Sequence, residues 1–122
     1  MDKMKVTIVI AAYNEEKSIA NVIKELKSKG YEDIIVVNDG SKDNTSDIAS
    51  KEKVAVLNHI INRGQGAALK TGIEYALNKG ADIIITFDAD GQHSASDISR
   101  LIEPITEGEA PWQHNSGTTT PA

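Results

Sequence analysis

The fold of this chain is decided by residues 83–93, which read IIITFDADGQH. β-Branched and apolar residues fill the first five positions, a pattern that predicts one buried strand. The run then stops at Asp88 and Asp90, with Gly91 available for a sharp turn before Gln92. Because an unpaired carboxylate is costly inside a sheet, we expect both acids at the carboxyl end of the strand, where they can meet a cation. Their hard oxygens suit Mg²⁺ or Mn²⁺, and Gln92 could add a neutral oxygen ligand.

The same stretch also has a simpler interpretation, a strand that closes in a polar turn. Asp and Gly often end strands, and a lone Asp-x-Asp is weak evidence for a metal site. The remainder of the chain has to decide between these two interpretations.

Composition describes one soluble globular domain. Hydrophobic residues form 39% of the 122-residue chain and charged residues 25%, which is enough for a domain with a real core. The net charge of -5 argues against a nucleic-acid partner, and the absence of cysteine excludes disulfides and thiolate chemistry. The apolar run at residues 6–10 is too short for a signal peptide or a membrane span, so the sequence predicts a cytoplasmic location.

Strands and helices are predicted to alternate along the chain. Apolar runs predict strands at Val6–Ala12, 34–38, 54–57 and Ile83–Asp88, the third being weak and expected at a sheet edge. Asp43 or Asn44 is expected to cap a short second helix through about residue 50. Three further helices are predicted from apolar faces made of Ile19, Val22, Ile23 and Leu26; of Ala68, Leu69, Ile73, Ala76 and Leu77; and of Ile98, Leu101, Ile102 and Ile105.

This alternation predicts an α/β fold with a parallel sheet covered on both faces. Ligands of such sheets bind outside the carboxyl ends of the strands, near the switch point in strand order. Polar clusters at 13–16, 38–41 and 88–93 each follow a predicted strand. We therefore expect them to share one rim, which favours a functional site over a set of unrelated turns.

Two other chemistries receive little support. The segment 64–71, GQGAALKT, matches neither a P-loop nor a dinucleotide fingerprint, because Leu69 stands where these need Gly or a small residue. Its glycines suit close backbone approach to an anion at a helix start, although a plain Gly-rich turn explains them nearly as well. The histidines lack metal-ligand spacing and no serine lies in a nucleophile elbow, so hydrolase chemistry is set aside.

Four stretches carry a family resemblance: AAYNEE at 11–16, VNDGSKDNT at 37–45, NRGQGAA at 62–68 and FDADGQH at 87–93. Together, over about residues 6–105, they resemble the nucleotide-binding half of a family 2 glycosyltransferase with the GT-A fold. The likeness is greatest to polyprenyl-phosphate sugar transferases such as dolichyl-phosphate mannosyltransferase. It implies a Rossmann-like sandwich whose mainly parallel sheet has the strand order 3-2-1-4.

The resemblance also implies a site. The residues at the nucleotide would be Ala12, Tyr13, Glu15, Asp39, Gly66, Asp88 and Ala89. Of these, Asp39 would hydrogen-bond the base or ribose, although its simpler role is that of a turn and cap residue. Asp88 and Asp90, as a DXD motif, would hold Mg²⁺ or Mn²⁺ on the diphosphate together with Gln92.

The implied reaction transfers a sugar from a UDP- or GDP-sugar to an acceptor, for which a polyprenyl phosphate is expected. Full-length members would work at the inner membrane face. From residue 108 the helical pattern is lost, so we expect 1–107 to be the donor-binding half, cut before the acceptor half, and 108–122 to be a disordered tail. Apolar surface left uncovered would favour a homo-oligomer. A catalytically inactive nucleotide-diphosphate-binding module and a non-enzymatic fragment remain the alternatives.

Overall fold

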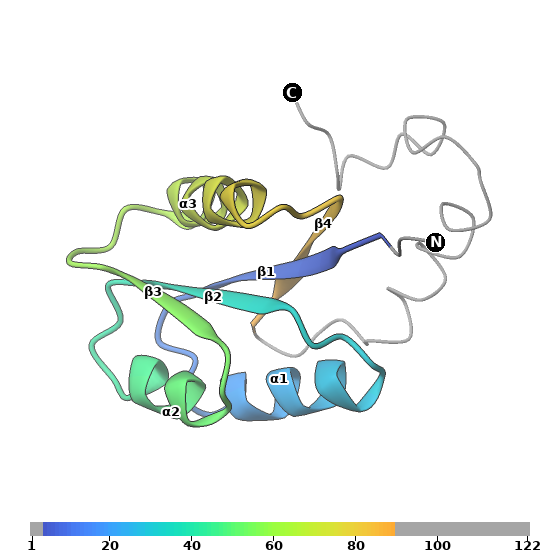
Figure 1. Ribbon diagram of the computed structural model, residues 1–122. Helices are drawn as coiled ribbons and strands as arrows, with labels where there is room; N and C mark the ends of the chain where they lie inside the picture. Colours follow the sequence, from blue (N-terminus) through green and yellow to red (C-terminus); the bar gives the residue numbers. More distant parts are fainter. Residues whose placement is uncertain (1–3, 90–122) are drawn as a thin grey trace.

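The computed structural model describes residues 4–89 (Figure 1). The elements are β1 (Val6–Ala12), α1 (Ile19–Ser28), β2 (Ile34–Asp39), α2 (Thr45–Lys51), β3 (Ala55–His59), α3 (Gln65–Asn78) and β4 (Ile83–Asp88). The helix predicted around residues 98–105, the expected tail at 108–122 and the expected metal ligands Asp90 and Gln92 lie outside the described residues.

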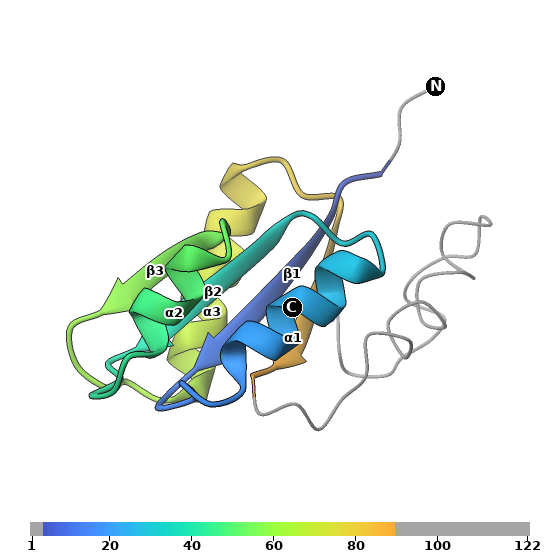
Figure 2. The ribbon, with the colours of Figure 1, turned by 90° about the horizontal axis from the view of Figure 1, so that it is seen from below.

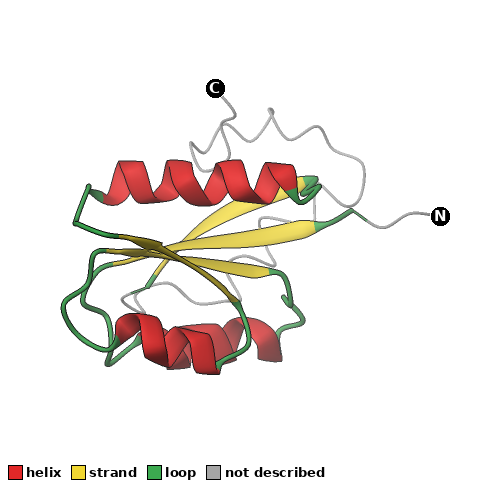
Figure 3. Cartoon of the chain, turned by 60° about the vertical axis from the view of Figure 1, so that its left-hand side comes forward, coloured by secondary structure: helices red, strands yellow, loops and turns green. Residues whose placement is uncertain are grey.

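The four strands form one parallel sheet in the predicted order, β3-β2-β1-β4. β1 lies between β2 and β4, so that Ile8 is in register with Ile34 on one side and Ile85 on the other. β3 occupies an edge, as expected, although it spans Ala55–His59 instead of 54–57. Helices cover both faces, with α3 on one and the pair α1 and α2 on the other (Figure 3). α1 and α2 lie side by side beneath the sheet (Figure 2).

Each face of the sheet buries its own apolar cluster, because successive side chains of a strand point to opposite sides. Ile8 and Ile10 of β1 pack with the predicted face of α1, including Ile23 and Leu26. The intervening Val9 packs towards α3. Burial on both faces explains why the strands read as continuous apolar runs.

The predicted apolar face of α3 is wrong at one end, because Leu77 is 60% exposed. The buried residues of this helix are Ala68, Gly72 and Ala76, which repeat every fourth position. A Cβ on Gly72 would overlap Cγ1 of Val9, so the helix rests on the sheet through its smallest residues. Leu77 lies five positions beyond Gly72, about 140° around the helix, and therefore points away from the sheet.

Candidate functional site

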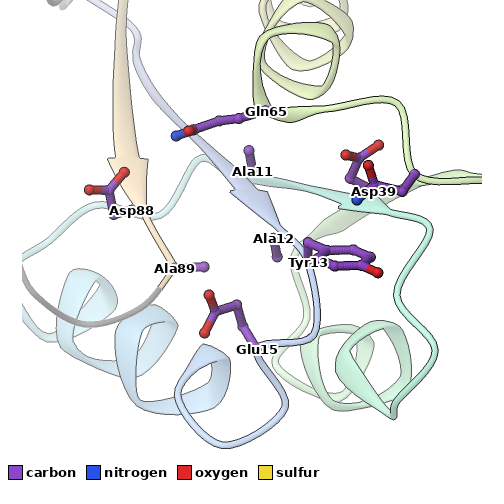
Figure 4. A pocket seen from close by; sticks show the side chains of 9 residues that line it. Ala11, Ala12, Tyr13, Glu15, Asp39, Gln65, Asp88 and Ala89 are labelled. Carbon is purple, nitrogen blue, oxygen red and sulfur yellow. The ribbon is translucent and has the colours of Figure 1, made fainter.

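A cavity of ≈ 410 Å³ opens at the carboxyl ends of β1, β2 and β4. Its lining residues are Ala11, Ala12, Tyr13, Glu15, Asp39, Asn62, Gln65, Asp88 and Ala89. The cavity lies at the switch point of the sheet, where the chain leaves β1 for α1 on one face while α3 covers the other. Asp88 and Ala89 lie on one side of it, and Tyr13 and Asp39 on the other (Figure 4).

The structure brings together all but one of the residues expected at the nucleotide. The exception is Gly66, which is not among the lining residues although its neighbour Gln65 is. A Cβ added to Gly66 would meet no described atom within 4 Å, so packing does not require a glycine there. The roles expected for these residues towards a nucleotide remain predictions.

Three lining residues were missed from the sequence: Ala11, Asn62 and Gln65. Asn62 and Gln65 belong to the NRGQGAA stretch, and their position directly after β3 is the signal that could have identified them. Gly40 explains how Asn62 reaches the cavity. Its φ is 73°, and a Cβ there would collide with the backbone nitrogen of Asn62, so only glycine lets the loop after β3 pass this close to the end of β2.

The wall formed by Tyr13 and Glu15 is fastened to the loop that follows β2. Between them, Asn14 adopts a left-handed φ of 54°, which asparagine tolerates better than most residues. Its N–H donates to Ser41 Oγ at 2.8 Å, and the Glu15 N–H donates to Thr45 Oγ1 at 2.9 Å. The two polar clusters that follow β1 and β2 therefore hold each other in place.

Asp39, the last residue of β2, accepts three hydrogen bonds. Its Oδ1 accepts from Arg63 N–H at 2.9 Å and lies 2.8 Å from His59 Nδ1, and its Oδ2 accepts from Gly64 N–H at 2.8 Å. Burial raises the pKa of Asp39, but the Arg63 amide, the His59 ring and the Gly64 amide outweigh it and hold the pKa below the usual 3.8. Asp39 is therefore ionised at neutral pH. A carboxylate has about four acceptor directions, so one remains, on Oδ2.

The end of β4 is tied to the start of α1 through Ser18. This residue occupies the N-cap position of α1 but makes no capping hydrogen bond with its side chain. Its hydroxyl instead donates to the Ala89 carbonyl oxygen at 2.6 Å and lies 3.2 Å from a Glu15 carboxylate oxygen. The backbone beside Asp88 is thereby held at the cavity.

The lining of the cavity has the chemistry of a cation-assisted anion site. Among residues 4–89, the lining contains three carboxylates, of Glu15, Asp39 and Asp88, and no Lys or Arg. A cation would offset the repulsion between such an acidic pocket and a diphosphate, and carboxylate oxygens are the ligands that Mg²⁺ and Mn²⁺ prefer. Of the three expected metal ligands, Asp88 is the one within residues 4–89, where no group of three acidic or histidine side chains could by itself hold a metal.

The comparison with known families decides the relationship. The family model described as glycosyl transferase family 2 matches residues 7–114. The chain belongs to glycosyl transferase family 2. Within the family it is 43% identical over 121 residues to UDP-N-acetylglucosamine–dolichyl-phosphate N-acetylglucosaminyltransferase of Methanococcus voltae, covering 85% of the chain and 48% of that protein. It is 33% identical over 108 residues to undecaprenyl-phosphate mannosyltransferase of Micrococcus luteus, covering 84% and 44%.

A solved structure supports the same relationship. Glucosyl-3-phosphoglycerate synthase of Mycobacterium tuberculosis, crystallised with Mn²⁺, uridine diphosphate and glucosyl-3-phosphoglycerate, matches this family 2 chain with a TM-score of 0.70 and 26% identity. The match covers 87% of the chain and 41% of the synthase. It confirms the predicted GT-A fold, and the chain spans less than half the length of each of these relatives. Within residues 4–89 the longest helix has 14 residues, and none is long and apolar enough to cross a membrane.

Proposed function

We propose that this chain forms the donor-binding part of a glycosyltransferase that moves a sugar from a UDP-sugar to a polyprenyl phosphate. The observation that carries the proposal is the acidic cavity at the switch point of a family 2 chain, lined by Tyr13, Asp39 and Asp88. Because the chain spans less than half of its relatives, the reaction of the whole protein is part of the proposal.

The base and ribose would occupy the side of the cavity formed by Tyr13 and Asp39. The Tyr13 side chain offers a flat aromatic surface there, and the residue is 42% exposed. Asp39 has one acceptor direction left, which matches a single N–H donor. Uracil presents one such donor, whereas the corresponding edge of guanine presents a ring N–H and an amino group, so the geometry favours UDP over GDP. UDP is also the nucleotide named for the relatives from M. voltae and M. tuberculosis.

The diphosphate would lie between the start of α3 and the end of β4. Free backbone amides at a helix start favour an anion, and the open space at Gly66 lets a phosphate come close to them. Asp88, with Asp90 and Gln92, would hold Mg²⁺ or Mn²⁺. Such an ion stabilises the charge that develops on a leaving diphosphate. An acceptor phosphate is already anionic, so little is needed from a general base.

Nucleotide binding can be tested by calorimetry with UDP and GDP, in Mn²⁺ and in EDTA. We expect UDP to bind more tightly than GDP, and more tightly in Mn²⁺ than in EDTA. Asp88→Asn should remove the advantage of Mn²⁺. The matched control is Asp82→Asn, which makes the same change near the opposite end of β4, where the carboxylate accepts from Lys5 N–H. Unchanged UDP affinity of Asp88→Asn in saturating Mn²⁺ would make this carboxylate a strand-closing turn.

The acceptor is tested separately, by transfer of a radiolabelled sugar. Polyprenyl phosphate is proposed because dolichyl and undecaprenyl phosphate appear in the names of the relatives at 43% and 33% identity. 3-Phosphoglycerate is the comparison acceptor, since the M. tuberculosis synthase carries its glucosyl derivative. UDP binding without transfer to either acceptor would support the alternative of a nucleotide-binding module. The cytoplasmic location and the homo-oligomer remain predictions, the latter checked by sedimentation.

A further inference from the structure

His59 joins three elements next to the cavity without lining it. It is the last residue of β3 and lies in register with Asp39 at the end of β2. Its Nδ1 is 2.8 Å from Asp39 Oδ1, and its Nε2 is 2.9 Å from Oγ1 of Thr71, two turns into α3. The side chains of His59 and Asp39 are only 8% and 4% exposed.

The ring connects the carboxylate of Asp39 to α3. An ionised carboxylate only accepts, so Nδ1 donates to Asp39. At the other side of the ring, the Thr71 hydroxyl is the hydrogen-bond partner of Nε2, and its oxygen also lies 3.0 Å from the carbonyl oxygen of Ala67, one turn earlier. The two nitrogens thus link the end of β2 to α3.

We propose that His59 is a positioning residue for the nucleotide site: it connects the Asp39 carboxylate to Thr71 of α3 and so fixes the loop 60–64. That loop is held by the two amides that donate to Asp39, those of Arg63 and Gly64. It delivers Asn62 and Gln65 to the cavity. The effect on UDP rests on the proposed nucleotide binding, whereas the hold on the loop 60–64 does not.

The arrangement is stable because every polar group in it is satisfied. A buried carboxylate offsets its desolvation only when hydrogen bonds satisfy it, and here two amides and the His59 ring do so. If the hydroxyl of Thr71 were removed, Nε2 of the buried ring would lose its hydrogen-bond partner. The ring would then turn, and its hold on Asp39 would weaken.

The first test is the imidazole ¹⁵N spectrum of the full 122-residue chain at neutral pH, with the His59 signals assigned by their loss in His59→Gln. A protonated Nδ1 is expected, with and without UDP. An Nδ1 without a proton would overturn the contact with Asp39. This measurement does not depend on nucleotide binding, so it still decides that contact if UDP fails to bind.

The second test compares Thr71→Val, which removes the hydroxyl at nearly constant volume, with Thr71→Ser, which keeps it. In the valine variant UDP affinity should fall about fivefold to tenfold, and the Arg63 and Gly64 amide protons should exchange faster. The serine variant should stay within about twofold of the wild type in both measurements. Unchanged UDP affinity and unchanged amide exchange in a folded Thr71→Val would overturn the positioning role.

Discussion

Replacing Gly72 by alanine is expected to lower the free energy of unfolding, although alanine is the better helix former. The added Cβ would overlap Cγ1 of Val9 and lie 3.0 Å from Cγ2 of Val37. Both valines are fully buried and β-branched, so neither can swing aside, and α3 would have to rise from the sheet. Overpacking costs about 1–3 kcal/mol, and alanine recovers about 1 kcal/mol of helix propensity. With two stiff neighbours the upper part of that range applies, which leaves a net loss of about 1–2 kcal/mol.

The assay is urea and thermal unfolding followed by circular dichroism. A loss of that size should lower Tm by about 4–16 °C for a domain of this length. Gly66→Ala is the matched control in the same helix, because its Cβ meets no described atom. It should be neutral or stabilise by up to about 1 kcal/mol. If Gly72→Ala proves as stable as the wild type while Gly66→Ala behaves as expected, the close packing of α3 on the sheet does not restrict position 72 to glycine.

Ser18→Ala should weaken the free energy of UDP binding in Mn²⁺ more than it lowers the free energy of unfolding, because the hydroxyl donates to Ala89 instead of capping α1. A UDP affinity equal to that of the wild type would show that the end of β4 does not need this hydrogen bond. Removing the divalent ion with EDTA should weaken UDP binding by at least about fivefold, since metal and diphosphate strengthen each other's binding equally, and equal affinities in a calorimeter would argue against a metal in the cavity. Stability should also fall in acid. Burial raises the pKa of Asp43, but hydrogen bonds from the Thr45 hydroxyl and amide and from the Glu16 amide outweigh it, so the pKa lies below 3.8. A carboxylate whose pKa is lower in the folded state stabilises the fold when the pH is above its unfolded-state pKa, and it loses that contribution as the pH falls through its folded-state pKa. Asp43→Asn should therefore make the fall in the free energy of unfolding below about pH 4, measured by urea unfolding, less steep. An equally steep fall in the variant would remove Asp43 as a cause.

Much of the fold could be predicted because parallel strands buried on both faces leave a strong pattern. β1 and β4 have the predicted bounds, and the strand order follows the expectation from the family resemblance. The buried face of α3 was harder to predict, because apolar spacing counts large side chains, whereas this helix packs on the sheet through Gly72. A pattern of that kind cannot distinguish a leucine that faces the core from one that has rotated past it.

Most of the described residues that line the cavity were expected from the sequence, but the contacts that hold them were not. Tyr13 and Asp88 directly follow or end apolar runs, so a rim of polar residues can be inferred from the sequence. The link from Asp39 through His59 to Thr71 depends on the pairing register of β2 with β3 and on the distance between α3 and these strands. Nothing in the local sequence around these three residues encodes those two quantities.

The position of β4 beside β1 has a consequence for folding during synthesis. Val6 pairs with Ile83, a separation of 83 − 6 = 77 residues, so one flank of β1 stays open until β4 has been translated. A nascent chain that has left the ribosome only as far as β3 can already place Tyr13 and Asp39, but not Asp88. During that interval the free flank of β1 can pair with a strand of another chain. Arrival of β4 pairs that flank of β1 and brings Asp88 and Ala89 to the cavity in the same step, so strand pairing and assembly of this wall of the cavity occur together.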